Sequence, residues 1–502
     1  MKKNSFWNLL SLVVFIVCTL SVSVTATQID PLPAWAYGTF NGYIDGGVNS
    51  GTATMTVTSL GKITGKLVLW GKSYAFSAAS YAAGGSPTDG FSVTVNPGKQ
   101  FMPLTFRVTK SSPESMPQMQ LGVATGKLND SWLGYCLSNH NCEDIRDLPV
   151  TMYRDVWKEA GTSPIGYYTA TLPGIVGEYG SGYLTFTVDA AGKFKTVGKL
   201  ADGTALSPSG TLILDETGCV FAVIYTSPAA YKGGCLFGLV EFVTPVVTEG
   251  EIPLVFLRLP DKVKFNWNSL NYLATKDYAS GFLRTPGLSG GWYDKLKGLQ
   301  TYYTKLSVGN MTGAPIITAT VTTTYWGSDD NGNDRKFTER VPTDVEATCW
   351  NPGGLVLTVT ENGLVPLNKP ETPKKDPGTG EYNYDLGNAT GLTISLMRAT
   401  GIFRGSFNVY YDYISADNST LDVPTQTYSH VVKKASYEGV LLSPERDPAD
   451  GIPGAGRGFY LWPGKSTYEK VDKFGEPLVD KNGNPILIPY SFNVSYDFLI
   501  NE

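Results

Sequence analysis

Two histidines, His140 and His430, are the only imidazoles in this chain of 502 residues. A Ser–His–Asp triad needs one of them beside an activated serine, because the imidazole accepts the serine proton. No Gly-x-Ser-x-Gly turn joins a strand pattern to a helix pattern; the glycine- and serine-containing stretches at 84–90 and 287–291 are typical of turns. The sequence therefore gives no support to a serine hydrolase, and it predicts no catalytic residue of that kind.

Cysteine and histidine meet once at a spacing that a metal could use, at Cys136, His140 and Cys142. A structural zinc site needs four ligands, and no fourth ligand follows at a matching spacing. We interpret the segment as a short loop closed by a Cys136–Cys142 disulfide that carries an exposed histidine. The sequence predicts no metal and no cofactor.

The acidic stretch at 328–334, SDDNGND, has the composition of a calcium loop. An EF-hand loop that began at Asp329 would need glycine at Asp334 and glutamate at Arg340, so the pattern fails at both positions. We expect an Asn-Gly turn between two strands. A calcium site of another type remains the alternative.

An aromatic segment at 265–303 is the strongest indication of binding. Exposed tryptophan and tyrosine rings can stack on sugar faces or anchor a protein partner, although the same rings also fill β cores. The candidate ligand-binding residues are Trp267, Trp292, Tyr293, Tyr302 and Tyr303. Binding of a glycan requires that these rings be exposed on one patch.

Paired carboxylates would be enough for glycoside hydrolysis, which needs only an acid and a base or nucleophile. The chain has 45 acidic residues, and the sequence alone selects no pair of them. Cys219 and Cys235 have a spacing that suggests a disulfide. A hairpin centred near Ala230 would instead place Cys219 opposite Val240, so we expect no bridge between them.

Composition favours sheet over helix, with 56 glycines, 29 tyrosines and only 17% charged residues. The net charge of −5 and the lack of a basic cluster argue against nucleic acid and against an anionic membrane surface as partners. Residues 1–26 match a signal peptide, with Lys2 and Lys3 before an apolar run at 9–20 and small residues ending at Ala26. We therefore expect an exported chain (periplasm, cell surface or extracellular) with no transmembrane span after cleavage.

Two similar segments, at 52–67 and 183–200, indicate how the chain is built. Each alternates apolar residues with threonine or another outward residue, and each turns at Gly61-Lys62 or Gly192-Lys193. Glycine suits such a turn because it adopts positive φ without steric cost. We expect two copies of one β-hairpin, with Tyr183 and Thr185 facing solvent.

These patterns predict an all-β protein of antiparallel barrels or sandwiches, built from duplicated β-hairpin units and with little helix. Residues 30–260 are expected to form one β domain of two related units, 30–160 and 165–260. Residues 261–502 would form a second β domain, with the aromatic segment at its start and a long loop at 362–387. The best place for a short helix is 144–158.

Several motifs recur together: the two Gly-Lys hairpins, the segment 200–204, the spacing of Trp267 and Tyr278 before Gly281-Phe282, and the segments 400–407, 438–440 and 456–459. In this order they resemble functionally uncharacterised Gly/Thr-rich β modules of large exported bacterial surface proteins. The resemblance covers most of the chain after residue 26. It implies export and β architecture, and it assigns no catalytic residue.

The function expected from these observations is that of an exported, non-enzymatic β-scaffold at the cell surface or in a matrix, with a structural, adhesive or ligand-binding role. Its expected partner is a glycan or a cell-surface protein. One alternative is a glycan-binding module that uses the aromatic segment 265–303. The other is a secreted carbohydrate-active enzyme.

Overall fold

The computed structural model describes most of the chain after residue 31. The described residues are 32–113, 118–129, 147–160, 163–174, 179–231, 233–244, 255–269, 282–295, 299–329, 331–361, 363–419, 425–443, 454–469, 478–479, 485 and 487–502. The proposed signal peptide and the pair Cys136 and Cys142 lie outside these residues. Within them nearly all of the regular secondary structure is strand, with antiparallel pairing except between β22 and β29, so the all-β prediction is confirmed.

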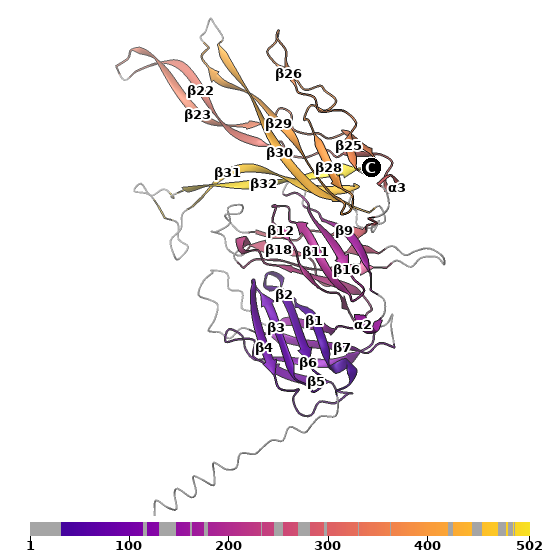
Figure 1. The fold of residues 1–502 in the computed structure, drawn as a ribbon. Helices are drawn as coiled ribbons and strands as arrows, with labels where there is room; N and C mark the ends of the chain where they lie inside the picture. Colours follow the sequence, from indigo (N-terminus) through magenta and orange to yellow (C-terminus); the bar gives the residue numbers. More distant parts are fainter. Residues whose placement is uncertain are drawn as a thin grey trace, which may run out of the picture.

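Three sheets follow one another along the chain and form three stacked units (Figure 1). The first unit has the strand order β4-β3-β2-β1-β8-β7-β6-β5, and its two edge strands contact each other, so the sheet is a nearly closed barrel. Its strands are β1 (Gly38–Ile44), β2 (Gly51–Val57), β3 (Ile63–Leu69), β4 (Lys72–Ala78), β5 (Phe91–Val95), β6 (Leu104–Ser111), β7 (Leu121–Leu128) and β8 (Leu148–Arg154).

The middle unit has the order β12-β11-β10-β9-β20-β17-β16-β15-β14, with β13 on β11 and β18 between β16 and β19. Its strands are β9 (Gly166–Leu172), β10 (Gly182–Val188), β11 (Lys193–Lys199), β12 (Ala205–Leu206), β13 (Ser209–Thr211), β14 (Ile213–Leu214), β15 (Val220–Thr226), β16 (Leu236–Val243), β17 (Phe256–Arg258), β18 (Asn266–Ser269), β19 (Phe282–Arg284) and β20 (Ser289–Trp292).

The third unit has the order β23-β22-β29-β30-β31-β32-β21-β24-β25. A further strand, β28, also pairs with β29. Its strands are β21 (Leu306–Val308), β22 (Ile316–Ser328), β23 (Asp334–Glu346), β24 (Val356–Val359), β25 (Leu364–Pro366), β28 (Thr393–Met397), β29 (Ile402–Asp417), β30 (Gln426–Leu441), β31 (Gly456–Glu469) and β32 (Leu487–Asn501). A separate pair, β26 (Lys374–Lys375) and β27 (Tyr382–Asn383), lies in the long loop expected at 362–387. The paired strands β22 and β23, called here the ribbon, extend away from the stack (Figure 1).

All three units share one strand connection, because the first strand of each pairs with its last strand. These pairs are β1 with β8, β9 with β20, and β21 with β32. The sheets therefore divide the chain at other points than the sequence suggested. The middle sheet continues past residue 260 to Trp292, since β18 and β20 complete it, and the third sheet begins at Leu306.

The two similar segments are hairpins, as predicted. β2 pairs with β3 and β10 pairs with β11, and the two hairpins occupy equivalent places in their sheets. Gly61 and Gly192 have φ of +86° and +67°, so each turn uses the left-handed conformation that favours glycine. This equivalence is the arrangement that duplication would produce.

One prediction about the second hairpin is wrong. Tyr183 and Thr185 were expected to face solvent, but each is only 4% exposed. Their side of β10 is covered by the third unit, where Tyr183 packs with Val440 and Phe459. The alternation was interpreted correctly, but the second face of this sheet is also buried.

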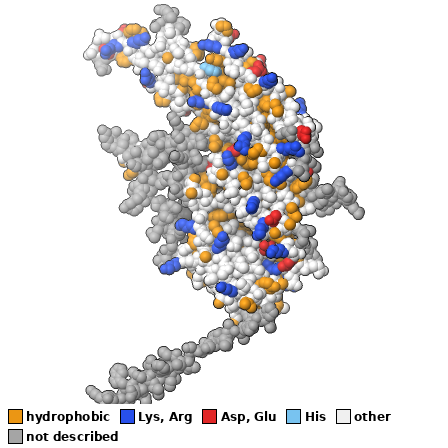
Figure 2. All heavy atoms as spheres, in the orientation of Figure 1, with side chains coloured by type: hydrophobic (Ala, Val, Ile, Leu, Met, Phe, Trp, Pro, Cys, Tyr) orange, Lys and Arg blue, Asp and Glu red, His pale blue; other side chains and the backbone are white. Residues whose placement is uncertain are grey.

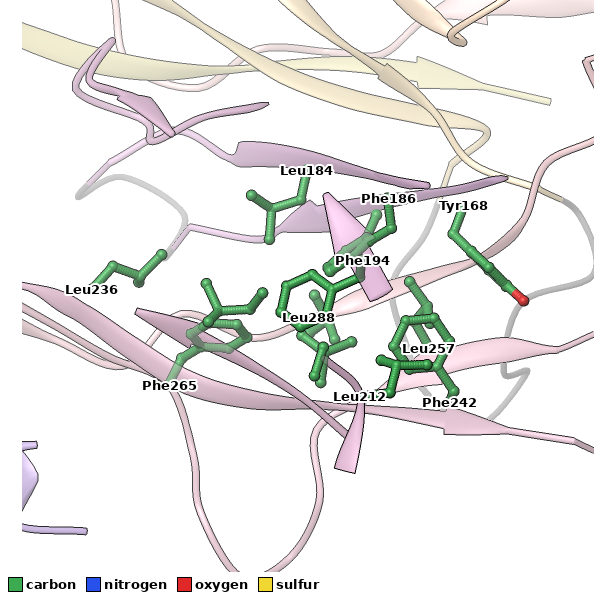
Figure 3. Close-up of a cluster of buried hydrophobic side chains, with 14 of the residues drawn as sticks. Tyr168, Leu184, Phe186, Phe194, Leu212, Leu236, Phe242, Leu257, Phe265 and Leu288 are labelled. Carbon is green, nitrogen blue, oxygen red and sulfur yellow. The ribbon is translucent and has the colours of Figure 1, made fainter. Parts of the chain in front are cut away.

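Each unit has its own apolar core, because alternate strand residues point inward. Figure 3 shows the core of the middle unit, in which Leu184, Phe186 and Phe194 of the hairpin meet Phe242 of β16 and Phe265, which directly precedes β18. In the described part of the chain, helix is confined to short segments, including the α-helices α2 (Trp157–Ala160) and α3 (Leu299–Tyr302) and the 3₁₀ turns η1 (Ala34–Ala36), η2 (Gly47–Asn49) and η3 (Ala229–Tyr231).

A helix was expected at 144–158, but the described part of this range, from residue 147 onward, is mostly strand. β8 occupies Leu148–Arg154, and the helical turn begins only at Trp157. Val150 and Met152 alternate as buried residues of the barrel, so burial in the sheet outweighs the local helical pattern. Among the described residues, no helix has the length and apolar character needed to cross a membrane.

The first unit meets the middle unit through tyrosines. The Gly71 N–H donates to the Tyr225 hydroxyl at 3.0 Å, and Tyr43 packs against the core of the middle unit. Burial raises the pKa of Tyr43 to about 12, with added effects of Asp45, Glu216 and Asp215, and burial also raises the pKa of Tyr225 to about 12. Both phenols are therefore held in the neutral form.

This junction is expected to fail in alkali. A folded-state pKa above the usual tyrosine value of about 10 contributes stability that is complete below pH 10 and is lost as the pH rises towards 12. We expect tyrosinate absorbance at 295 nm to appear together with loss of near-UV circular dichroism across this range, and Tyr43→Phe to move the loss to higher pH. Full ionisation near pH 10 with the folded spectrum intact would contradict this.

Candidate functional site

The aromatic segment does not form the exposed patch that glycan stacking requires. Trp267, Tyr293 and Tyr303 are 1%, 5% and 4% exposed, and Trp292 is half-buried against the core of the middle unit. Tyr302 ends α3, and its side chain lies outside the described part of the structure. The prediction of a sugar-stacking surface is wrong for the three buried rings, because they fill cores and junctions.

Two of these tyrosines bond to carbonyl groups of the third unit, Tyr293 from the end of the middle unit and Tyr303 from within the core of the third unit itself. The Tyr293 hydroxyl donates to the Arg398 carbonyl at 2.9 Å, and the Tyr303 hydroxyl donates to the Leu442 carbonyl. Trp267 lies deeper, and its Nε1–H donates to the Tyr231 hydroxyl at 3.1 Å. These aromatic residues are structural.

The cysteine prediction for the middle unit is confirmed, since Cys219 and Cys235 are both free. The hairpin register differs from the one expected, because Val240 pairs with Ala222 and Cys219 stands just before the ladder begins at Val220. The pair Cys136 and Cys142 lies outside the described residues.

The acidic stretch at 328–334 is the turn of the ribbon. Asp329 accepts hydrogen bonds from the backbone N–H groups of Asn331 and Asn333, and Gly332 has φ of +79°. In the part of the chain that the structure describes, no group of histidine, cysteine and acidic side chains could hold a metal ion. The stretch behaves as the predicted turn.

His430 belongs to a hydrogen-bonded cluster on the outer face of β29 and β30. Its Nδ1 lies 2.6 Å from Asp412 Oδ1, and its ring stacks on Tyr382 with centroids 3.6 Å apart. The Tyr384 hydroxyl donates to the other Asp412 oxygen at 2.5 Å. The cluster therefore fixes the loop that carries β27 against the third sheet.

Cys349 lies near this cluster but is not an activated nucleophile. Burial, and then the negative charge of Asp412, raise the pKa of its thiol to about 11. A nucleophilic cysteine needs the opposite shift, because the thiolate is the reactive form. The cluster lacks the electrostatics of a cysteine hydrolase.

The junction between the middle and third units contains buried polar contacts. The Gly180 N–H donates to Ser495 Oγ at 3.2 Å, and Ser495 Oγ donates to the Ala201 carbonyl at 2.6 Å. Ser181 Oγ donates to Asp497 Oδ1 at 2.6 Å. Burial raises the pKa of Asp497, against the lowering effects of the Ser181 hydrogen bond and of the Arg457 charge.

A groove of about 690 Å³ opens beside this junction. It is called here the junction groove and is lined by Lys199, Gly203, Arg404, Gly405, Ser406, Lys434, Ser436, Tyr437, Glu438, Phe459 and Leu461. Most of these residues come from β29 and β30, where alternate side chains point outward. The middle unit contributes Lys199 at the end of the predicted second hairpin and Gly203 in the turn after it. The groove is therefore the best-defined candidate site.

The groove contains more positive than negative charge. Glu438 is the one acidic residue of its lining, and it pairs with Lys199 and accepts a hydrogen bond from the Tyr183 hydroxyl at 3.3 Å. Arg404 donates to the Met397 thioether, a weak acceptor that does not neutralise it, and Lys434 is exposed. The arrangement suits binding of an anion better than acid–base catalysis.

Sequence reasoning missed these groove residues. Arg404 and Ser406 on one strand, and Lys434 and Ser436 on the next, do alternate with apolar residues, which predicts polar faces. The register of the two strands brings these polar faces together, and the docking of two units brings Lys199 to them. Neither can be seen in local sequence.

Comparison of the chain with known protein families, with curated proteins and with solved structures finds no match. Inference about function therefore depends on the geometry described above.

Proposed function

We propose that this protein is an exported, non-enzymatic β-scaffold at the cell surface or in a matrix. The observation that carries the proposal is the stack of three units, in each of which the first strand pairs with the last, and which are joined to one another by hydrogen bonds and apolar packing. Such a stack holds the ribbon of the third unit at a fixed place far from the first unit (Figure 1). The residue pattern of 1–26 supports the export part of the proposal.

Hydrolysis of a glycan is the weaker alternative. A glycosidase needs two carboxyl groups about 5–10 Å apart that flank the substrate. The junction groove offers one carboxylate, and that carboxylate is engaged by Lys199 and Tyr183. The non-enzymatic reading therefore fits this groove better.

The proposal is tested by expressing residues 1–502 in a bacterial host that secretes proteins. We expect the protein outside the cytoplasm with a new N-terminus at Thr27, measured by fractionation and mass spectrometry. The purified product should release no reducing sugar from a panel of polysaccharides. A cytoplasmic protein with Met1 retained, or sugar release by the pure protein, would refute the corresponding half of the proposal.

A further inference from the structure

We propose that the junction groove binds an anionic oligosaccharide that carries carboxylate or sulfate groups. The proposal deepens the ligand-binding part of the proposed function, which it takes as its basis. The junction groove has a volume of about 690 Å³, which lies within the range of small-ligand sites.

The lining of the junction groove includes one ion pair. Lys199 and Glu438 neutralise each other, so the positive charges that remain in the groove are those of Arg404 and Lys434. Both side chains are exposed and reachable from solvent. A ligand that contacts them gains charge-assisted hydrogen bonds, which are stronger than neutral ones.

The spacing of Arg404 and Lys434 along the sheet favours an extended ligand. Arg404 pairs directly with Glu438 across the two strands, and Lys434 stands four residues before Glu438 on β30. At the rise of an antiparallel strand, the two cationic positions are about 13 Å apart along the sheet. A chain with repeated negative groups can contact both cations without either side chain leaning along the sheet towards the other, so the spacing favours such a chain over one small anion.

The lining between the two cations suits a sugar. Ser406 and Ser436 form a directly opposed pair of hydroxyl-bearing residues there, and Leu461 adds a partly buried apolar surface. Hydroxyl groups can exchange hydrogen bonds with sugar hydroxyls because each both donates and accepts.

Single-stranded nucleic acid fits the groove less well. Its bases need exposed aromatic platforms, and the two rings of the lining, Tyr437 and Phe459, are each only 3% exposed. Figure 2 shows basic and acidic side chains dispersed over the visible face, without a basic field that would attract a nucleic acid backbone.

The test is calorimetric titration of the exported chain with oligogalacturonate, which carries carboxylates, and with sulfated dextran oligosaccharides. Neutral maltohexaose, poly-glutamate and inorganic phosphate are the comparison ligands. We expect binding of at least one anionic oligosaccharide that weakens as salt is added. The Arg404→Ala/Lys434→Ala double variant should weaken it at least tenfold without changing the melting temperature, since both residues are exposed.

The matched control is Lys336→Ala/Arg340→Ala, which removes the same charge from exposed positions on β23 of the ribbon. It should leave the affinity within twofold of the parent protein. Equal loss in both double variants, equal binding of maltohexaose, or binding of poly-glutamate or phosphate as tight as that of the oligosaccharides overturns the proposal. Such a result leaves the scaffold proposal standing, because export and absence of turnover are measured separately.

Discussion

Replacing Trp267 by alanine is expected to destabilise the middle unit by about 3–5 kcal/mol, the usual cost of removing a buried tryptophan. The ring is 1% exposed and lies edge-to-face with Tyr179 and Phe282, at centroid distances of 5.8 and 5.0 Å. The substitution would leave a cavity and would also remove the hydrogen bond that Trp267 donates to the Tyr231 hydroxyl, which itself donates to Asp202. Chemical denaturation followed by tryptophan fluorescence and circular dichroism measures the loss.

The control for Trp267→Ala is Trp326→Ala, because Trp326 lies on the ribbon and is 65% exposed. Its removal should change stability by no more than about 0.5 kcal/mol, as for most surface positions. If Trp267→Ala proved as mild as the control and instead abolished binding to a neutral glycan, the original sugar-stacking interpretation would be restored.

A valine at Gly180 is expected to separate the middle unit from the third. A Cβ atom there would lie 2.5 Å from the Tyr496 carbonyl oxygen and 2.8 Å from the Phe459 Cβ, so the two units must move apart. Overpacking of this kind typically costs about 1–3 kcal/mol, here concentrated at one junction. The hydrogen bond from Gly180 to Ser495 would be strained as well.

The measurable result is a change in cooperativity and shape. Gly180→Val should show a separate, earlier thermal transition and a larger radius of gyration in small-angle scattering, because the joint between the units becomes loose. Gly363→Val is the matched control, since its Cβ would meet no atom within 4 Å and its φ lies outside the positive range. A single unchanged transition in Gly180→Val would show that the junction does not couple the units.

The sequence predicts those features of the fold that depend only on neighbouring residues. Alternating residues and turn glycines predicted the hairpins around Gly61 and Gly192, and their strands and turns are as expected. The length and exposure of the loop at 362–387 were also largely anticipated, apart from the short strands within it. Both predictions need only the preference of neighbouring residues for one backbone conformation.

Packing between distant segments could not be predicted in this way. Tyr183 has the sequence context of an outward residue and is buried only because the third unit docks on it. Trp267 and Tyr303 lie in an aromatic segment that has the composition of a binding surface, but they are buried in the cores of their own units, among residues distant in the sequence. Arg404 and Lys434 of the groove have one local feature that the sequence shows. Each is a polar residue on a strand whose side chains point alternately to the two faces of the sheet.

The pairing of β1 with β8, of β9 with β20 and of β21 with β32 has a mechanical consequence. In each pair the start of the first strand lies beside the end of the last, as where Phe40 meets Arg154. A tensile load on both ends of one unit would therefore break the backbone hydrogen bonds of that pair one after another. It would not load all of these hydrogen bonds at the same time, as a shear geometry would. Under stretch, each unit would yield gradually at low force and let the chain lengthen before it broke.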